Sequence, residues 1–108
     1  MTAIEEATIR FAADIKETDV YQEYYRRLSA IKAEPKLYEK VNEFRMKNFK
    51  LQSCEQSDGL LEKVEHLEQE YEDIIDNPLV DDFLRAEIAF CRMMQDINKY
   101  ITLELEFG

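Results

Sequence analysis

The sequence predicts an all-α fold, a single domain over residues 1–108 built as an antiparallel helical bundle with a long C-terminal helix. Three observations predict it. Two glycines and two prolines in 108 residues are too few for a turn-rich β fold. Glu, Lys, Leu, Ala and Ile, which favour helices, are abundant. Apolar residues recur at helical spacings. Five helices are expected, at residues 1–17, 19–33, 35–53, 59–76 and 78–106.

The first two expected helices are separated by a short polar step. In the first, Ile4, Thr8, Phe11 and Ile15 fall on one helical stripe. Asp19 begins the second helix, and Gln22 follows three residues later, which is the spacing of a capping box. The second helix should end at Glu34, because the residue before a proline avoids the helical conformation. Pro35 then suits the first turn of the third helix.

A break in the apolar period separates the third and fourth helices. The third stripe ends at Leu51 and the fourth begins at Leu60, out of phase by two residues, or about 200° of helix rotation. The polar run QSCEQSDG lies between them. A helix–loop–helix is the preferred interpretation, with Asp58 as a candidate N-cap or Gly59 as the residue after a helix end. One long kinked helix is the alternative.

The last helix has the clearest start signal in the chain. Asn77 is a favourable N-cap and Pro78 a favourable first residue. Asp81 and Asp82 then lie near the positive end of the helix dipole. Since its length matches the third and fourth helices placed end to end, we expect it to pack antiparallel against them.

Two neighbouring apolar stripes make this last helix apolar over about half of its surface. Such a helix is either central in the monomer or shared with a second chain, and the narrow stripes of the other helices favour the second reading. The candidates for core or interface are Leu79, Phe83, Phe90, Met93, Met94, Ile97, Tyr100 and Ile101.

The charge distribution is uneven. The net charge of −10 argues against a general partner made of nucleic acid or anionic lipid. Residues 26–50 contain eight basic and three acidic residues, a net +5, whereas residues 51–77 contain one and nine, a net −8. These are either two solvated helix faces or two surfaces that pair with each other. The candidates for a basic contact surface are Arg26, Arg27, Lys32, Lys36 and Lys40.

No residues point to catalysis, a cofactor or a metal. His66 is the single histidine, and Glu62 and Glu70 flank it at four-residue spacing, which is more typical of a solvated helix face than of a metal site. Cys54 and Cys91 are too few for a zinc site or an iron–sulfur cluster. We therefore expect a non-enzymatic protein with no catalytic, cofactor-binding or metal-binding residues.

Two blocks of the sequence resemble the YlbF/YmcA family of small helical bacterial proteins. One is TDVYQEYYRRLSAIKAEPKLYEKVNEFR, at residues 18–45, and the other is NPLVDDFLRAEIAFCRMMQDINKYI, at residues 77–101. The resemblance implies a helical bundle that forms homo- or hetero-oligomers. It also implies regulation of development, competence and biofilm formation, linked to mRNA processing. The chain is most similar to short members without the cysteine-rich C-terminal tail, so cluster binding is not carried over.

The expected function is therefore that of a regulatory or adaptor protein that acts through helix-mediated homo- or hetero-oligomerisation. Its partners would be a second copy, other family members or a regulatory protein complex. RNA binding through the basic face of residues 26–50 is the alternative. No membrane or DNA partner is expected. The chain shows no signal peptide or membrane span, so a cytoplasmic location is expected.

Overall fold

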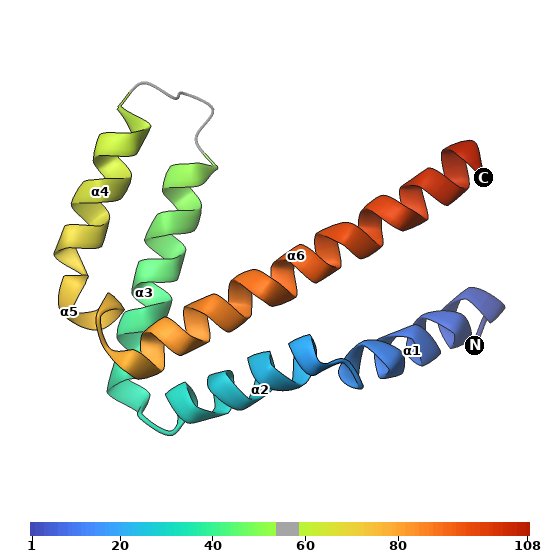
Figure 1. Ribbon diagram of the computed structural model, residues 1–108, viewed down its shortest axis with the longest axis horizontal. Helices are drawn as coiled ribbons and strands as arrows, with labels where there is room; N and C mark the ends of the chain where they lie inside the picture. Colours follow the sequence, from blue (N-terminus) through green and yellow to red (C-terminus); the bar gives the residue numbers. More distant parts are fainter. Residues whose placement is uncertain (54–58) are drawn as a thin grey trace. The chain divides into compact units, whose positions relative to one another are not determined.

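The computed structural model describes residues 1–53 and 59–108, and every regular element in these ranges is an α-helix (Figure 1). The all-α prediction and the long C-terminal helix are thus confirmed. The helices are α1 (Ala3–Lys16), α2 (Asp19–Lys32), α3 (Pro35–Gln52), α4 (Leu60–Glu70), α5 (Glu72–Ile75) and α6 (Pro78–Phe107).

The chain divides into two compact units. Unit 1 contains Met1–Leu28 and Phe83–Gly108, and unit 2 contains Ser29–Asp82. The two units are described separately below. The single domain expected over residues 1–108 stays a prediction.

Aromatic rings join α2 to α6 in unit 1. The Tyr24 ring stacks on Phe90 with centroids 4.9 Å apart and lies 6.0 Å from Phe83, and Tyr21 meets the edge of Phe90 at 5.8 Å. Phe83 is fully buried. The order of these pairs shows that the two helices run in opposite directions, as Figure 1 shows. From its length, the last helix is predicted to pack on residues 35–53 and 59–76. In the structure, the aromatic contacts of α6 are made with α2 instead, because Tyr21 and Tyr24 supply the complementary rings.

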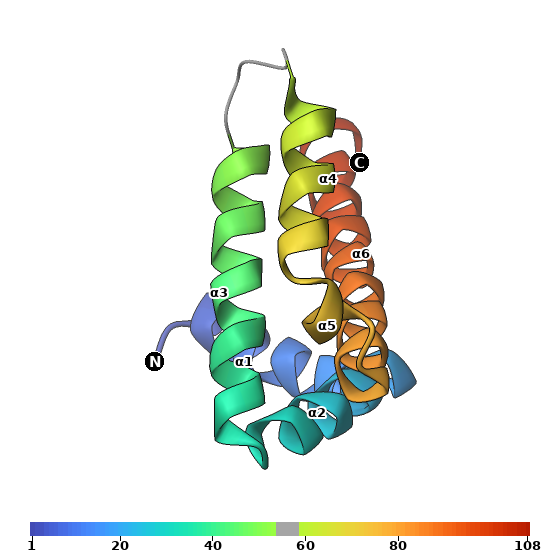
Figure 2. The same cartoon turned by 90° about the vertical axis from the view of Figure 1, so that its left-hand side faces the viewer.

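Unit 2 is organised around an antiparallel pair formed by α3 and α4 (Figure 2). Phe44 of α3 packs against Tyr71, which follows α4, with ring centroids 5.6 Å apart. Both residues are buried, as is Leu67 of α4. The remaining buried residues of this unit are Ile31, Val41 and Val80. The core of unit 2 thus includes Ile31 at the end of α2 and Val80 at the start of α6 in addition to residues of α3 and α4.

Side-chain oxygens mark three of the helix starts. The N–H of Glu5 donates to Thr2 Oγ1 and that of Tyr21 donates to Thr18 Oγ1, both at 3.1 Å. The N–H of Leu79 donates to Asn77 Oδ1 at 3.0 Å, as the sequence predicts. The capping box expected from Asp19 and Gln22 is wrong. Thr18 caps this helix, and the Gln22 amide instead donates to backbone carbonyls at 3.4 Å.

The fourth expected helix is divided at Tyr71. This residue leaves the helical conformation, with φ −107° and ψ 20°, and separates α4 from α5. The burial of its ring against Phe44 accompanies the break, and apolar periodicity does not reveal such a contact. Gly59 has φ +74° and precedes α4 as its N-cap, so its predicted role after a helix end is wrong. Cys54 and the candidate cap Asp58 lie outside the described residues.

Candidate functional site

Unit 1 carries many large apolar side chains that its own chain leaves exposed. No residue of α1 is buried. In α6 the buried apolar residues Val80, Phe83 and Ala86 lie near its start, whereas Tyr100 is 71% exposed and Leu105 is 82% exposed near its end. Large exposed apolar surfaces mark interaction sites in soluble proteins. We use the name exposed apolar set of unit 1 for the exposed large apolar residues of α1 and of residues 100–107 in α6, namely Ile4, Ile9, Phe11, Tyr100, Ile101, Leu103, Leu105 and Phe107.

The eight candidates for core or interface are divided by the structure into three groups. Phe83 is buried, and three of the others are half-buried, namely Phe90, Met93 and Ile97. The exposed ones are Leu79, Met94, Tyr100 and Ile101. The exposed group lies mainly in the second half of α6. Whether these residues form an interface stays a prediction.

Three of the five basic candidates are partly compensated by ion pairs. Arg26 and Arg27 both form ion pairs with Glu23, and Lys40 lies 3.5 Å from Glu43. Lys32 Nζ lies 5.9 Å from the centroid of the Tyr38 ring. The remaining member, Lys36, is exposed. These intrahelical pairs reduce the charge that RNA phosphates would meet, and RNA binding stays an untested alternative.

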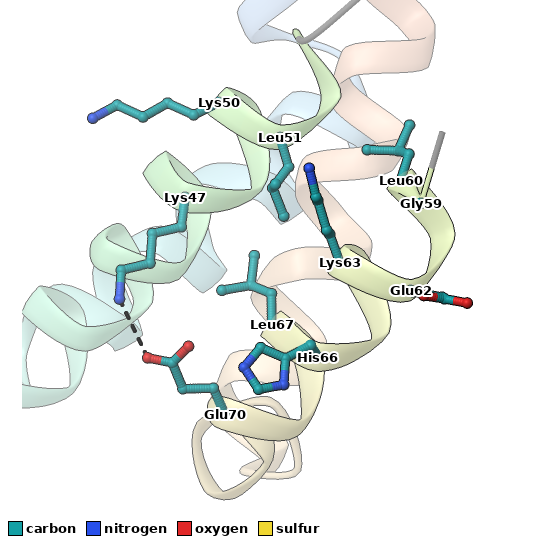
Figure 3. A pocket seen from close by; sticks show the side chains of 10 residues that line it. All are labelled: Lys47, Lys50, Leu51, Gly59, Leu60, Glu62, Lys63, His66, Leu67 and Glu70. Carbon is teal, nitrogen blue, oxygen red and sulfur yellow. Dashed lines mark hydrogen bonds and ion pairs between the residues drawn. The ribbon is translucent and has the colours of Figure 1, made fainter. Parts of the chain in front are cut away.

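An open groove in unit 2 is lined by residues of α3 and α4 (Figure 3). Three leucines form its apolar lining, namely Leu51, Leu60 and Leu67. Three lysines stand around them, namely Lys47, Lys50 and Lys63. His66, Glu62, Glu70 and Gly59 complete the lining. We call this site the α3–α4 groove. Its lining thus combines three leucines with three lysines and two carboxylates.

Lys47 links the groove to the core of unit 2. Its ammonium lies 3.4 Å from a Glu70 carboxylate oxygen and 5.0 Å from the centroid of the Tyr71 ring. The Tyr71 hydroxyl in turn donates to Glu43 at 3.4 Å. A hydrogen bond with Tyr71 is the main cause that raises the pKa of Lys47 above its ordinary value of 10.5, and Glu70 raises it further. Lys47 is therefore a stable cation at neutral pH.

Metal-binding chemistry finds no support among the described residues. His66, Glu62 and Glu70 all line the groove, but Figure 3 shows the Glu62 side chain pointing away from the other two. Within residues 1–53 and 59–108, no group of three or more His, Cys, Asp and Glu side chains is placed to hold a metal ion. Cys91 is a free, exposed thiol.

The sequence interpretation missed the groove. The apolar period indicates only a stripe that begins at Leu60, and the charge distribution leaves open whether the basic residues are solvated or paired. The sequence feature that could have indicated the groove is the seven-residue interval between Leu60 and Leu67, with Lys63 between them. That signal becomes meaningful only when α3 brings Leu51 and Lys47 to the other side.

Comparisons with known proteins found a matching protein family and similar proteins in two organisms. The family described as "Control of competence regulator ComK, YlbF/YmcA" matches residues 4–106. A UPF0342 protein of Desulfitobacterium hafniense is 32% identical over 101 residues, which cover 92% of this chain and 82% of the relative. A UPF0342 protein of Caldicellulosiruptor bescii is 25% identical over 109 residues, which cover 99% and 92%. No solved structure matches the chain. None of the described helices is apolar enough along its length to cross a bilayer.

Proposed function

Since the chain belongs to the YlbF/YmcA family, whose description links it to control of the competence regulator ComK, we propose that it is a non-enzymatic adaptor that works by helix-mediated assembly. The partners are a second copy of the chain or other family members. The assembly would serve regulation of development, competence and biofilm formation linked to mRNA processing, as the resemblance implies.

The exposed apolar set of unit 1 is the observation that carries this proposal. Ile9 of α1 is 55% exposed and Ile101 of α6 is 47% exposed, although both are large and apolar. Burying such side chains contributes about 25 cal/mol for each Å² removed from water. The packing of a second apolar helical surface against this set would therefore be stabilised by the hydrophobic effect.

The test is the molar mass of the protein in solution, measured by light scattering and sedimentation equilibrium at tens of micromolar. We expect a dimer or higher oligomer for the unmodified chain. Ile9→Glu and Ile101→Glu each place a charge in the apolar set, and we expect both to shift the protein toward monomer.

A matched control is Leu61→Glu. Leu61 is 73% exposed, but it belongs to α4 in unit 2 and is not a member of the apolar set. This variant should assemble as the unmodified chain does. A strict monomer for the unmodified chain at tens of micromolar would refute the proposal.

A further inference from the structure

The α3–α4 groove has lysines that the described part of unit 2 does not neutralise. Lys47 is paired with Glu70 at 3.4 Å. Lys50 and Lys63 are exposed, and neither forms an ion pair within the described residues. The groove lining contains three lysines and two carboxylates, Glu62 and Glu70, so it has a small local excess of cations in a chain of net charge −10. An acidic helix with an apolar stripe matches both features.

The C-terminal end of α6 is such a helix. Tyr100, Leu103 and Phe107 fall at i, i+3 and i+7, and they are 71%, 43% and 79% exposed. At 100° per residue, Glu104 and Glu106 lie on either side of this stripe. The last turn contains no basic residue. Two carboxylates at the negative end of the helix dipole are unfavourable in isolation, so nearby ammonium groups would stabilise this end.

The apolar side chains on the two sides also suit each other. Leu51 and Leu60 are half-buried and present apolar surface to the groove, whereas Leu67 is only 5% exposed. Tyr100 and Phe107 are seven residues apart on α6, about 10.5 Å along the helix axis. Helices that bind in a groove commonly use anchors at i, i+3 or i+4, and i+7.

We propose that the α3–α4 groove receives the C-terminal end of α6, residues 100–107, from a second copy of this chain. The three anchors lie along Leu51 and Leu60, and Glu104 and Glu106 meet Lys50 and Lys63. If each copy inserts its own end into the groove of the other, the two contacts are equivalent and the assembly closes as a dimer. This inference rests on the proposed function and names one surface through which the assembly forms.

Charge exchange tests the contact. One variant is Lys50→Glu with Lys63→Glu, the second is Glu104→Lys with Glu106→Lys, and the third combines all four changes. We expect each of the first two to weaken the dimer by about tenfold or more, equivalent to about 1.4 kcal/mol. The combined variant should recover most of the loss, because its opposite charges again face each other. Sedimentation equilibrium over a range of protein concentrations measures all three.

Lys36→Glu with Lys40→Glu is the matched control. It makes the same change of charge on α3 at exposed positions that do not line the groove, and it should leave the dimer unchanged. All substituted residues are exposed, so helical circular dichroism should stay the same in every variant.

Two other results would distinguish failure of the groove contact from failure of the proposed function. If the unmodified chain assembles and both two-site variants assemble equally well, the groove contact is wrong and the proposed function still holds. If the unmodified chain does not assemble at any concentration, the proposed function is refuted, and this contact between copies with it.

Discussion

Single side-chain oxygens determine where several helices of this protein begin. Thr2, Thr18 and Asn77 each accept a backbone N–H in the first turn of α1, α2 and α6. These N–H groups have no partner inside their own helix, so a side-chain acceptor stabilises the helix end. At Asn77 the effect is combined with Pro78, whose fixed φ suits the first helical position.

Asn77→Ala should lower the free energy of unfolding by about 1 kcal/mol, because it removes the acceptor for the Leu79 N–H. Urea unfolding followed by circular dichroism measures the change. Asn77→Ser keeps an acceptor at this position and should retain most of the stability. Equal midpoints for the alanine variant and the unmodified chain would contradict the capping role.

Tyr71 has two functions at one position. Its ring fills the core of unit 2 against Phe44, and its hydroxyl interacts with Glu43 and Lys47. The pKa of Lys47 is raised above 10.5 in the folded chain. The contribution of this group to stability is therefore fully present below pH 10.5, and it is lost as the pH rises through the folded-state pKa.

Tyr71→Phe should move the pKa of Lys47 back toward 10.5, because it removes the hydrogen bond that is the main cause of the shift. NMR titration of the Lys47 side chain measures the midpoint. Tyr25→Phe is a suitable control, since Tyr25 is an exposed residue of unit 1. A Lys47 midpoint that is the same in the Tyr71→Phe variant and the unmodified chain would show that the hydroxyl has no such role.

At the scale of elements, α6 changes its role along its length. Near its start Val80, Phe83 and Ala86 are buried, and the aromatic contacts with α2 continue to Phe90. Beyond that point most of its large apolar side chains are exposed. One continuous helix thus combines a structural segment with a segment available for contact with a partner.

Phe83→Ala should destabilise the protein by about 3–5 kcal/mol, the usual cost of removing a fully buried aromatic side chain. Tyr100→Ala, in the exposed half of the same helix, should change the stability of the monomer by no more than about 0.5 kcal/mol. Urea unfolding at low protein concentration separates these effects from assembly. Similar losses for both variants would contradict the division of α6 into two segments.

At the scale of the whole molecule, groups of opposite charge occur in the two different units of the chain. Lysines surround the α3–α4 groove in unit 2, and carboxylates flank the end of α6 in unit 1. The net charge of −10 opposes nonspecific association between copies. A local contact between lysines and carboxylates would therefore select one orientation among the many ways in which apolar surfaces can meet.

Much of the fold could be predicted because the relevant signals are local. The start of α6 depends on Asn77 and Pro78, and the end of α2 depends on the step into Pro35. The site was less predictable. Tyr100 and Phe83 belong to one apolar stripe, yet one is 71% exposed and the other is fully buried. Apolar periodicity predicts burial for both residues, because it does not show which part of a stripe is covered by another helix.

Capping oxygens, prolines and apolar periods act within a few residues, so the chain alone was enough to establish the helices, their order and the family. Contacts between distant segments decided the rest. The rings of Tyr21 and Tyr24 selected α2 as the neighbour of α6, the packing of Tyr71 divided α4 from α5, and the pairing of α3 with α4 formed the groove. Apolar stripes of similar length do not reveal from sequence which helices pack against each other. That choice depends on the shapes and charges of the side chains that come into contact.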